Sequence, residues 1–127
     1  MAESPEEFAR RLEAAIPKVA KQTVAVVRKG SLNVKNEAKR NVLQTAPVRN
    51  AHAHQAINFD VDAPGGGVVV GEIGYDKTDK RGRIGNLLEF GGGGDHSPPH
   101  RDLARALESE EPRFVRALED MIKDVLD

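Results

Sequence analysis

The sequence predicts a single α+β domain, in which a long N-terminal helix is followed by a small antiparallel sheet and a C-terminal helix. The spacing of apolar residues is helical up to about residue 44, alternates from about residue 56, and is helical again after about residue 98. The chain has 127 residues, which is enough for one hydrophobic core of ordinary size and too few for two. We therefore expect residues 1–127 to form one domain.

Residues 5 to about 44 carry the pattern of one long amphipathic helix. Ser4 is suited to cap its first amides, Pro5 fits the first helical position, and Glu7 completes a capping box. Apolar side chains then recur every three or four residues along one face, at Phe8, Leu12, Ile16, Val19, Thr23, Val24, Val27, Val34, Ala38 and Val42. Pro17 is expected to kink this helix.

The length of this helix has a consequence for assembly. At about 1.5 Å per residue it would span roughly 60 Å, whereas a compact domain of this size is about 35 Å across. Either the segment before Pro17 folds back, or one end of the helix projects and buries its apolar stripe against another copy. The two arrangements are compatible with each other.

Residues 56–90 are expected to form an antiparallel sheet of three to four strands. Apolar and polar side chains alternate over 57–62, a glycine-rich turn follows at 64–67, and 68–75 returns as the second strand. The polar segment 76–86 is expected to be a mobile loop, and residues 84–90 to supply a third, short strand.

Residues 98–126 are expected to be helical. The glycines at 91–94 would form a hinge, Ser97 would cap the helix before Pro98 and Pro99, and Pro112 would restart it. Its apolar stripe comprises Leu103, Ala106, Leu107, Phe114, Leu118, Met121, Ile122 and Val125.

Composition and charge exclude several classes of protein. The chain has no cysteine, which rules out disulfides, thiolate metal sites and thiol nucleophiles. No apolar run approaches the roughly 20 residues of a membrane helix, and no signal region follows the acidic N-terminus, so we expect synthesis in the cytoplasm. Residues 1–50 carry ten Lys or Arg against five Asp or Glu, whereas residues 102–127 carry four against eight. Opposite ends of identical copies could therefore attract each other.

The sequence predicts no enzyme, no cofactor and no metal site. His52, His54, His96 and His100 lie in segments rich in alanine, glycine and proline, without the spacing that enforces a tetrahedral zinc site. The glycines at 91–94 are followed by Asp95, which would repel a phosphate. No nucleophile motif stands in a suitable context. A histidine-metal hydrolase is the weakest of the three hypotheses considered.

A small DNA-binding protein is the alternative function. Basic side chains gather on the first helix and in the following loop, at Lys18, Lys21, Arg28, Lys29, Lys35, Lys39 and Arg40 and at Lys77, Lys80, Arg81 and Arg83. The basic residues on the first helix are also typical of the solvent-exposed face of any amphipathic helix. Without clustered aromatic residues or a reading helix, sequence-specific recognition is disfavoured.

Three short motifs occur in a fixed order along nearly the whole chain. They are Ala46-Pro47-Val48 after the long helix, Leu88-Glu89-Phe90-Gly91 after the sheet, and Pro98-Pro99-His100 before a helix that contains Leu103 to Glu108. In this order the chain resembles the tail-completion, or neck, proteins of long-tailed double-stranded DNA phages, the HK-ninety-seven gene-product-ten-like tail components. It departs from them at Arg49-Asn50-Ala51, where that family commonly has Asp-Thr-Gly, and after Pro99, where Phe-Leu is usual.

The resemblance implies a non-enzymatic virion protein. It implies a homo-oligomeric ring, a hexamer, between the connector or stopper and the tail terminator, through which genomic DNA passes. It places the ring or subunit interface at Leu88, Glu89, Phe90, Gly91, Pro98 and Pro99, and a lumen- or neighbour-facing loop at Lys77, Lys80, Arg81 and Arg83. Leu88 and Phe90 would anchor the sheet. Glu89 would either hydrogen-bond a neighbour or the hinge amides, or face solvent.

Overall fold

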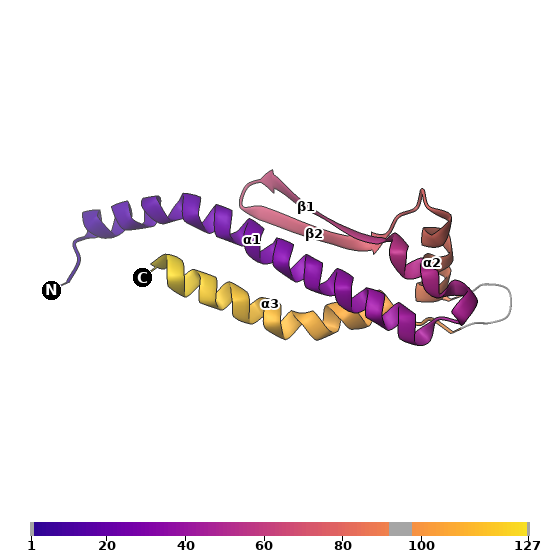
Figure 1. Ribbon diagram of the computed structural model, residues 1–127. Coiled ribbons are helices and arrows are strands. Elements are labelled where there is room, and N and C mark those ends of the chain that lie inside the picture. The colour runs from indigo at the N-terminus through magenta and orange to yellow at the C-terminus, as the bar shows by residue number, and fades with distance from the viewer. Residues whose placement is uncertain (1, 92–97, 127) are drawn as a thin grey trace.

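The computed structural model describes residues 2–91 and 98–126 and has the predicted mixture of helix and sheet. The elements are α1 (Pro5–Thr45), a 3-10 helix η1 (Val48–Ala56), β1 (Ile57–Gly65), β2 (Val68–Tyr75), α2 (Lys80–Phe90) and α3 (Asp102–Leu126). Figure 1 shows an elongated molecule in which α3 runs back along one side of α1 and the β1–β2 hairpin lies along another side.

The long first helix is confirmed, with bounds one residue from the expected end. Ser4 and Glu7 form the capping box: the Ser4 hydroxyl accepts from the Glu7 amide at 3.1 Å, and the Glu7 carboxylate accepts from the Ser4 amide at 3.4 Å. α1 continues through Pro17 without interruption, and its first turns bend away from the axis of the remainder in Figure 1. The segment before Pro17 is part of α1 and does not fold back onto the rest of this helix.

Within residues 2–91 and 98–126 the sheet has two strands, so the prediction of three to four strands was wrong. β1 and β2 pair antiparallel from Ile57 opposite Tyr75 to Asp62 opposite Val70, with an irregularity before the turn. Residues 84–90, expected as a third strand, belong to α2. Ile84, Leu87 and Leu88 follow helical spacing, which the strand interpretation overlooked.

The expected mobile loop at 76–86 is a tight turn followed by the first half of α2. Asp76 accepts hydrogen bonds from the Thr78 amide and hydroxyl, and Asp79 caps α2 by accepting from the Arg81 amide at 2.9 Å. Gly82 is buried against this turn, where a Cβ would overlap the Asp76 carbonyl. The turn and α2 are therefore fixed together.

The C-terminal helix begins at Asp102, four residues later than expected, and runs through Pro112 without restarting. On either side of this proline α3 is held to α1: the Asn33 amide donates to Glu110 at 2.9 Å, and the Phe114 ring lies over Gly30. These contacts compensate for the hydrogen bond that proline removes. Ser97 and the glycines at 92–94, expected as cap and hinge, lie outside the described residues.

The hydrophobic core lies at one end of the molecule. It joins the C-terminal half of α1 to η1, the start of β1, the end of β2 and the start of α3, through Val34, Ala38, Val42, Ala53, Ala56, Ile57, Tyr75 and Ala106. In the N-terminal half of α1 only Ala15 is buried. The predicted apolar stripe is thus covered at its C-terminal end and uncovered at its N-terminal end.

Candidate functional site

Two features of the described residues stand out: a buried polar cluster where α1, α2 and α3 meet, and an uncovered apolar surface at the opposite end of the molecule. Three or more potential metal ligands are not gathered anywhere within residues 2–91 and 98–126, and His96 lies outside that range. Nor does any helix in this range combine the length and hydropathy of a membrane span.

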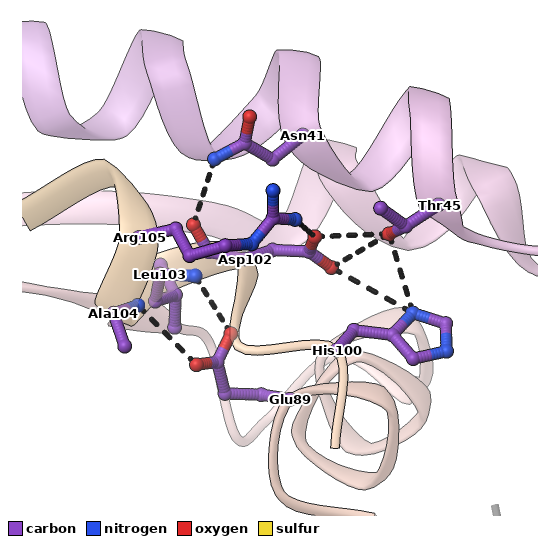
Figure 2. Close-up of polar contacts among 8 residues, drawn as sticks. All are labelled: Asn41, Thr45, Glu89, His100, Asp102, Leu103, Ala104 and Arg105. Carbon is purple, nitrogen blue, oxygen red and sulfur yellow. Dashed lines mark hydrogen bonds and ion pairs between the residues drawn. The ribbon is translucent and has the colours of Figure 1, made fainter. Parts of the chain in front are cut away.

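Glu89 of α2 caps the start of α3. Its carboxylate is only 4% exposed and accepts from the Leu103 amide at 2.7 Å and from the Ala104 amide at 3.3 Å, as Figure 2 shows. A helix N-terminus leaves such amides without partners, and it favours a negative charge. Neither alternative predicted for Glu89 describes this contact: the side chain is buried, and it bonds the amides of α3 within its own chain.

Asp102, the first residue of α3, is fully buried and holds α1 to α3 (Figure 2). Its carboxylate accepts from the Thr45 hydroxyl at 2.9 Å and from Arg105 at 2.7 Å, and its backbone carbonyl accepts from Asn41 at 3.0 Å. Buried carboxylates persist where charge and hydrogen bonds compensate the lost hydration. This cluster therefore holds the start of α3 against the C-terminal end of α1.

His100 lies beside Thr45 and Asp102 without forming a catalytic relay. Its Nδ1 atom is 3.2 Å from the Thr45 hydroxyl and 3.8 Å from the Asp102 carboxylate. A relay from nucleophile to carboxylate uses both ring nitrogens, whereas here one nitrogen faces both groups. The geometry suits positioning of the chain before α3 and not activation of Thr45.

Tyr75 completes the core beneath this cluster. Its ring occupies the space next to Gly85 where a Cβ would lie, and its hydroxyl is buried without a hydrogen-bond partner among the described residues. Burial, followed by the charges of Asp102 and Glu89, raises the pKa of the phenol above its ordinary value.

The remaining residues predicted for the subunit interface differ in their exposure to solvent. Leu88 packs against the core, as expected, but Phe90 is 73% exposed, so its prediction as an anchor of the sheet was wrong. Phe90 is the last residue of α2 and points away from the core, which follows from the change of strand to helix. Gly91 ends α2 with a φ of 79°, a left-handed conformation that favours glycine, and Pro98 and Pro99 are exposed. Their role in an interface stays a prediction.

The predicted basic loop lies at the core end of the molecule. Lys77, Lys80 and Arg83 are exposed. Arg81 is engaged within the chain, since it pairs with Asp79 at 2.6 Å and donates to Gln55. The hydrogen bonds from Arg81 lower the pKa of Asp79 to about 2.

The uncovered surface has apolar residues from three elements. We define the N-terminal apolar surface as Phe8, Leu12, Ile16 and Val19 of α1, Val68 of β2 and Leu126 of α3, which are 38% to 66% exposed. Most of these residues line a groove of about 590 Å³ between α1, the hairpin tip and the end of α3. A neighbouring groove of about 720 Å³, between α1 and the end of α3, carries Arg11, Lys18 and Lys21. Apolar and basic surface therefore adjoin each other on the N-terminal half of α1.

Sequence reasoning located the stripe from which this surface is built, but it did not identify the cluster around Asp102. Carboxylates in the first turn of a helix are a common capping signal; only the fold brings Asn41 and Thr45 against this one. Comparison of the chain with models of protein families, with curated proteins and with solved structures finds no match.

Proposed function

We propose that the chain is a structural virion protein of a phage neck, which forms a homo-oligomeric ring between the head connector and the tail and leaves a channel for DNA. The ordered motifs Ala46-Pro47-Val48, Leu88-Glu89-Phe90-Gly91 and Pro98-Pro99 support the family. The N-terminal apolar surface is the single observation that carries the assembly, because five of its six exposed residues line one groove and isolated monomers rarely expose large contiguous apolar patches. Its place is the virion neck after synthesis in the host cytoplasm.

The surface suited to cover this patch is the outward face of α3. At helical spacing this face carries two exposed acids and two exposed apolar residues: Glu108, Val115, Glu119 and Ile122. It thus offers apolar contacts to the N-terminal half of α1 and negative charge to Lys18 and Lys21. Two different surfaces that meet head to tail generate a closed ring when the rotation between copies is suitable.

The assembly is tested by a charge placed on the stripe. Ile16→Lys should abolish oligomers, measured by sedimentation velocity and by electron microscopy of particles assembled with the neck partners. The helix should stay folded, because Ile16 is 66% exposed. Leu43→Lys is the matched control, since Leu43 is 53% exposed on the same helix at the far end. Equal assembly of both variants would contradict the proposed contact.

The neck assignment is tested independently of oligomerisation in solution. Mass spectrometry of purified virions should find the polypeptide in a fixed ratio to the connector protein. Absence from intact particles would remove the proposal, whatever the free protein does.

DNA binding remains the second candidate, because Lys77, Lys80 and Arg83 are exposed together at one end of the molecule. Binding to duplex DNA at 50 and 200 mM salt distinguishes the two functions. Measurable affinity at the higher concentration, with a steep loss between the two, would favour a DNA-binding protein. In the neck role we expect only weak contact at both concentrations.

A further inference from the structure

Within the part of the chain that the structure describes, the outer edge of β2 carries backbone groups without hydrogen-bond partners. The amides of Phe59 and Val61 on β1 donate to the side chains of Asn58 and Asp60, at 2.9 and 3.0 Å, and so point away from β2. Opposite residues of an antiparallel pair direct their amides and carbonyls the same way relative to the pair, either both inward or both outward. Ile73 and Gly71, the register partners of Phe59 and Val61, therefore turn these groups outward from β2.

The two edges of the hairpin differ in how they are protected. Asn58 and Asp60 close the edge of β1 with their own side chains. Within the described residues no hydrogen bond reaches the outward groups of Gly71 and Ile73. An edge of this kind is a template for pairing with another strand.

A groove runs along this free edge. Two hollows of about 430 and 600 Å³ have β2 as one wall, α3 as the other and α1 as the floor. Both hollows are lined by Val34, Gly71, Ile73 and Leu107, so they form one continuous groove. A strand placed about 4.8 Å from β2 would lie inside it.

The charged side chains that line the groove are all acidic: Glu72, Glu89, Glu110 and Glu111. Glu89 caps α3, and Glu110 accepts from Asn33 and pairs with Arg113 at 2.9 Å. Glu72 and Glu111 are exposed, and neither makes an ion pair within the part of the chain described. The remaining lining is apolar apart from Ser31. The groove thus favours an occupant with apolar and cationic side chains.

We propose that this groove binds an extended segment of a different protein, which adds to β2 as a third strand and carries apolar residues alternating with lysine or arginine. A second copy fits less well. Its β1 edge is closed by Asn58 and Asp60, and its β2 would bring another Glu72 to an acidic groove. The apolar side chains of the segment face α1, and its cationic side chains lie near Glu72 and Glu111.

The probe is a capped heptapeptide that alternates valine and lysine, titrated into the ¹⁵N-labelled full chain. We expect saturable shifts centred on the amides of Gly71 and Ile73, and slower hydrogen exchange at both. A matched peptide that alternates valine and glutamate should bind at least tenfold more weakly. Equal affinity for the two peptides, or no saturable binding of the lysine peptide, would overturn the proposal.

Two pairs of variants locate the binding on the protein. Leu107→Lys should weaken the lysine peptide at least tenfold, while Val115→Lys, on the same helix outside the groove, should not. Both positions are about half exposed, at 58% and 45%, so each lysine is compatible with the fold, which circular dichroism checks. Glu111→Lys should also weaken binding, whereas Glu119→Lys should leave it unchanged.

Self-association provides the remaining outcome. If the free protein dimerises and Leu107→Lys removes the dimer while Val115→Lys does not, the groove belongs to a second copy and the proposal fails. Equal effects of Leu107→Lys and Val115→Lys on the peptide would also exclude this groove.

Discussion

At the residue scale, Glu89 shows how one buried carboxylate connects two helices. It belongs to α2, yet both hydrogen bonds of its side chain go to amides at the start of α3. Glu89→Ala should leave those amides without their acceptor and lower the free energy of unfolding by about 1–3 kcal/mol, measured by urea denaturation. Glu108→Ala is the control, because its pair with Arg101 is exposed and should contribute less than about 1 kcal/mol. Similar losses in both variants would contradict the capping role.

The raised pKa of Tyr75 predicts that the folded protein loses stability at alkaline pH. Its pKa is raised in the folded state, so between the ordinary pKa near 10 and the higher folded value only the unfolded chain releases the proton. The contribution of the buried phenol to the free energy of unfolding is therefore complete below pH 10 and falls as the pH rises above 10. Because this is the only tyrosine and the chain has no tryptophan, absorbance at 295 nm reports its ionisation directly.

Tyr75→Phe is the matched variant for this measurement. Among the described residues the hydroxyl has no hydrogen-bond partner, so its removal should leave stability at pH 7 unchanged or slightly higher. The decline above pH 10 that tyrosine ionisation causes should disappear. A phenol that titrates near pH 10 in the folded protein would contradict its burial.

Gly85 allows the close packing of α2 on β2. A Cβ at this position would overlap the Tyr75 ring, whereas a Cβ at Gly74 would meet no atom within 4 Å. Gly85→Ala should therefore lower the thermal midpoint by several degrees, corresponding to about 1–3 kcal/mol of overpacking. Gly74→Ala should change it little. A larger fall in the thermal midpoint for Gly74→Ala than for Gly85→Ala would contradict this packing of α2 on β2.

At the element scale, α1 consists of two halves with different surroundings. The C-terminal half is buried at Val34, Ala38 and Val42, and the N-terminal half only at Ala15. Helical stability in water comes mainly from packing of an apolar face. The first half is thus stable only to the extent that another surface covers it.

Hydrogen exchange of the monomer tests this difference. Amides over residues 8–20 should exchange much faster than those over residues 34–42, and assembly should slow the first group selectively. Uniform protection along α1 in the monomer would show that the N-terminal stripe needs no partner.

At the scale of the whole molecule, the described chain is too elongated for a compact domain of its length (Figure 1). A globular protein of this size has a radius of gyration near 14 Å. Small-angle scattering of the dilute monomer should give a clearly larger value. A value of about 14 Å would mean that the first helical turns fold back onto the core in solution.

Much of this architecture follows from local sequence patterns. Ser4, Pro5 and Glu7 specify where α1 begins, and its apolar period specifies one face for roughly 60 Å at about 1.5 Å per residue. The alternation over 57–62 and the glycines at 65–67 likewise specify the hairpin. These signals involve neighbours within a few residues, so a single sequence displays them.

Residues 80–90 carry a helical spacing of apolar residues that is too short to decide by itself between strand and helix. Two glycines and a short apolar run are compatible with strand or helix, and the choice depends on close contacts of Gly82 with Asp76 and of Gly85 with Tyr75. Those contacts exist only when α2 is already helical against the end of β2. Because these residues form a helix and not the expected strand, Phe90 lies at the surface and not in the core.

The sequence by itself determined the long amphipathic helix, the hairpin and the excess of apolar stripe over what one small domain buries. Tertiary structure alone decided which half of the stripe is covered, that Glu89 caps α3, and that Asp102 is buried against Asn41 and Thr45. The reason is separation along the chain: turn, cap and period signals act over a few residues, whereas these contacts join residues 14 to 61 positions apart. Their energies depend on burial that arises only once the elements pack together.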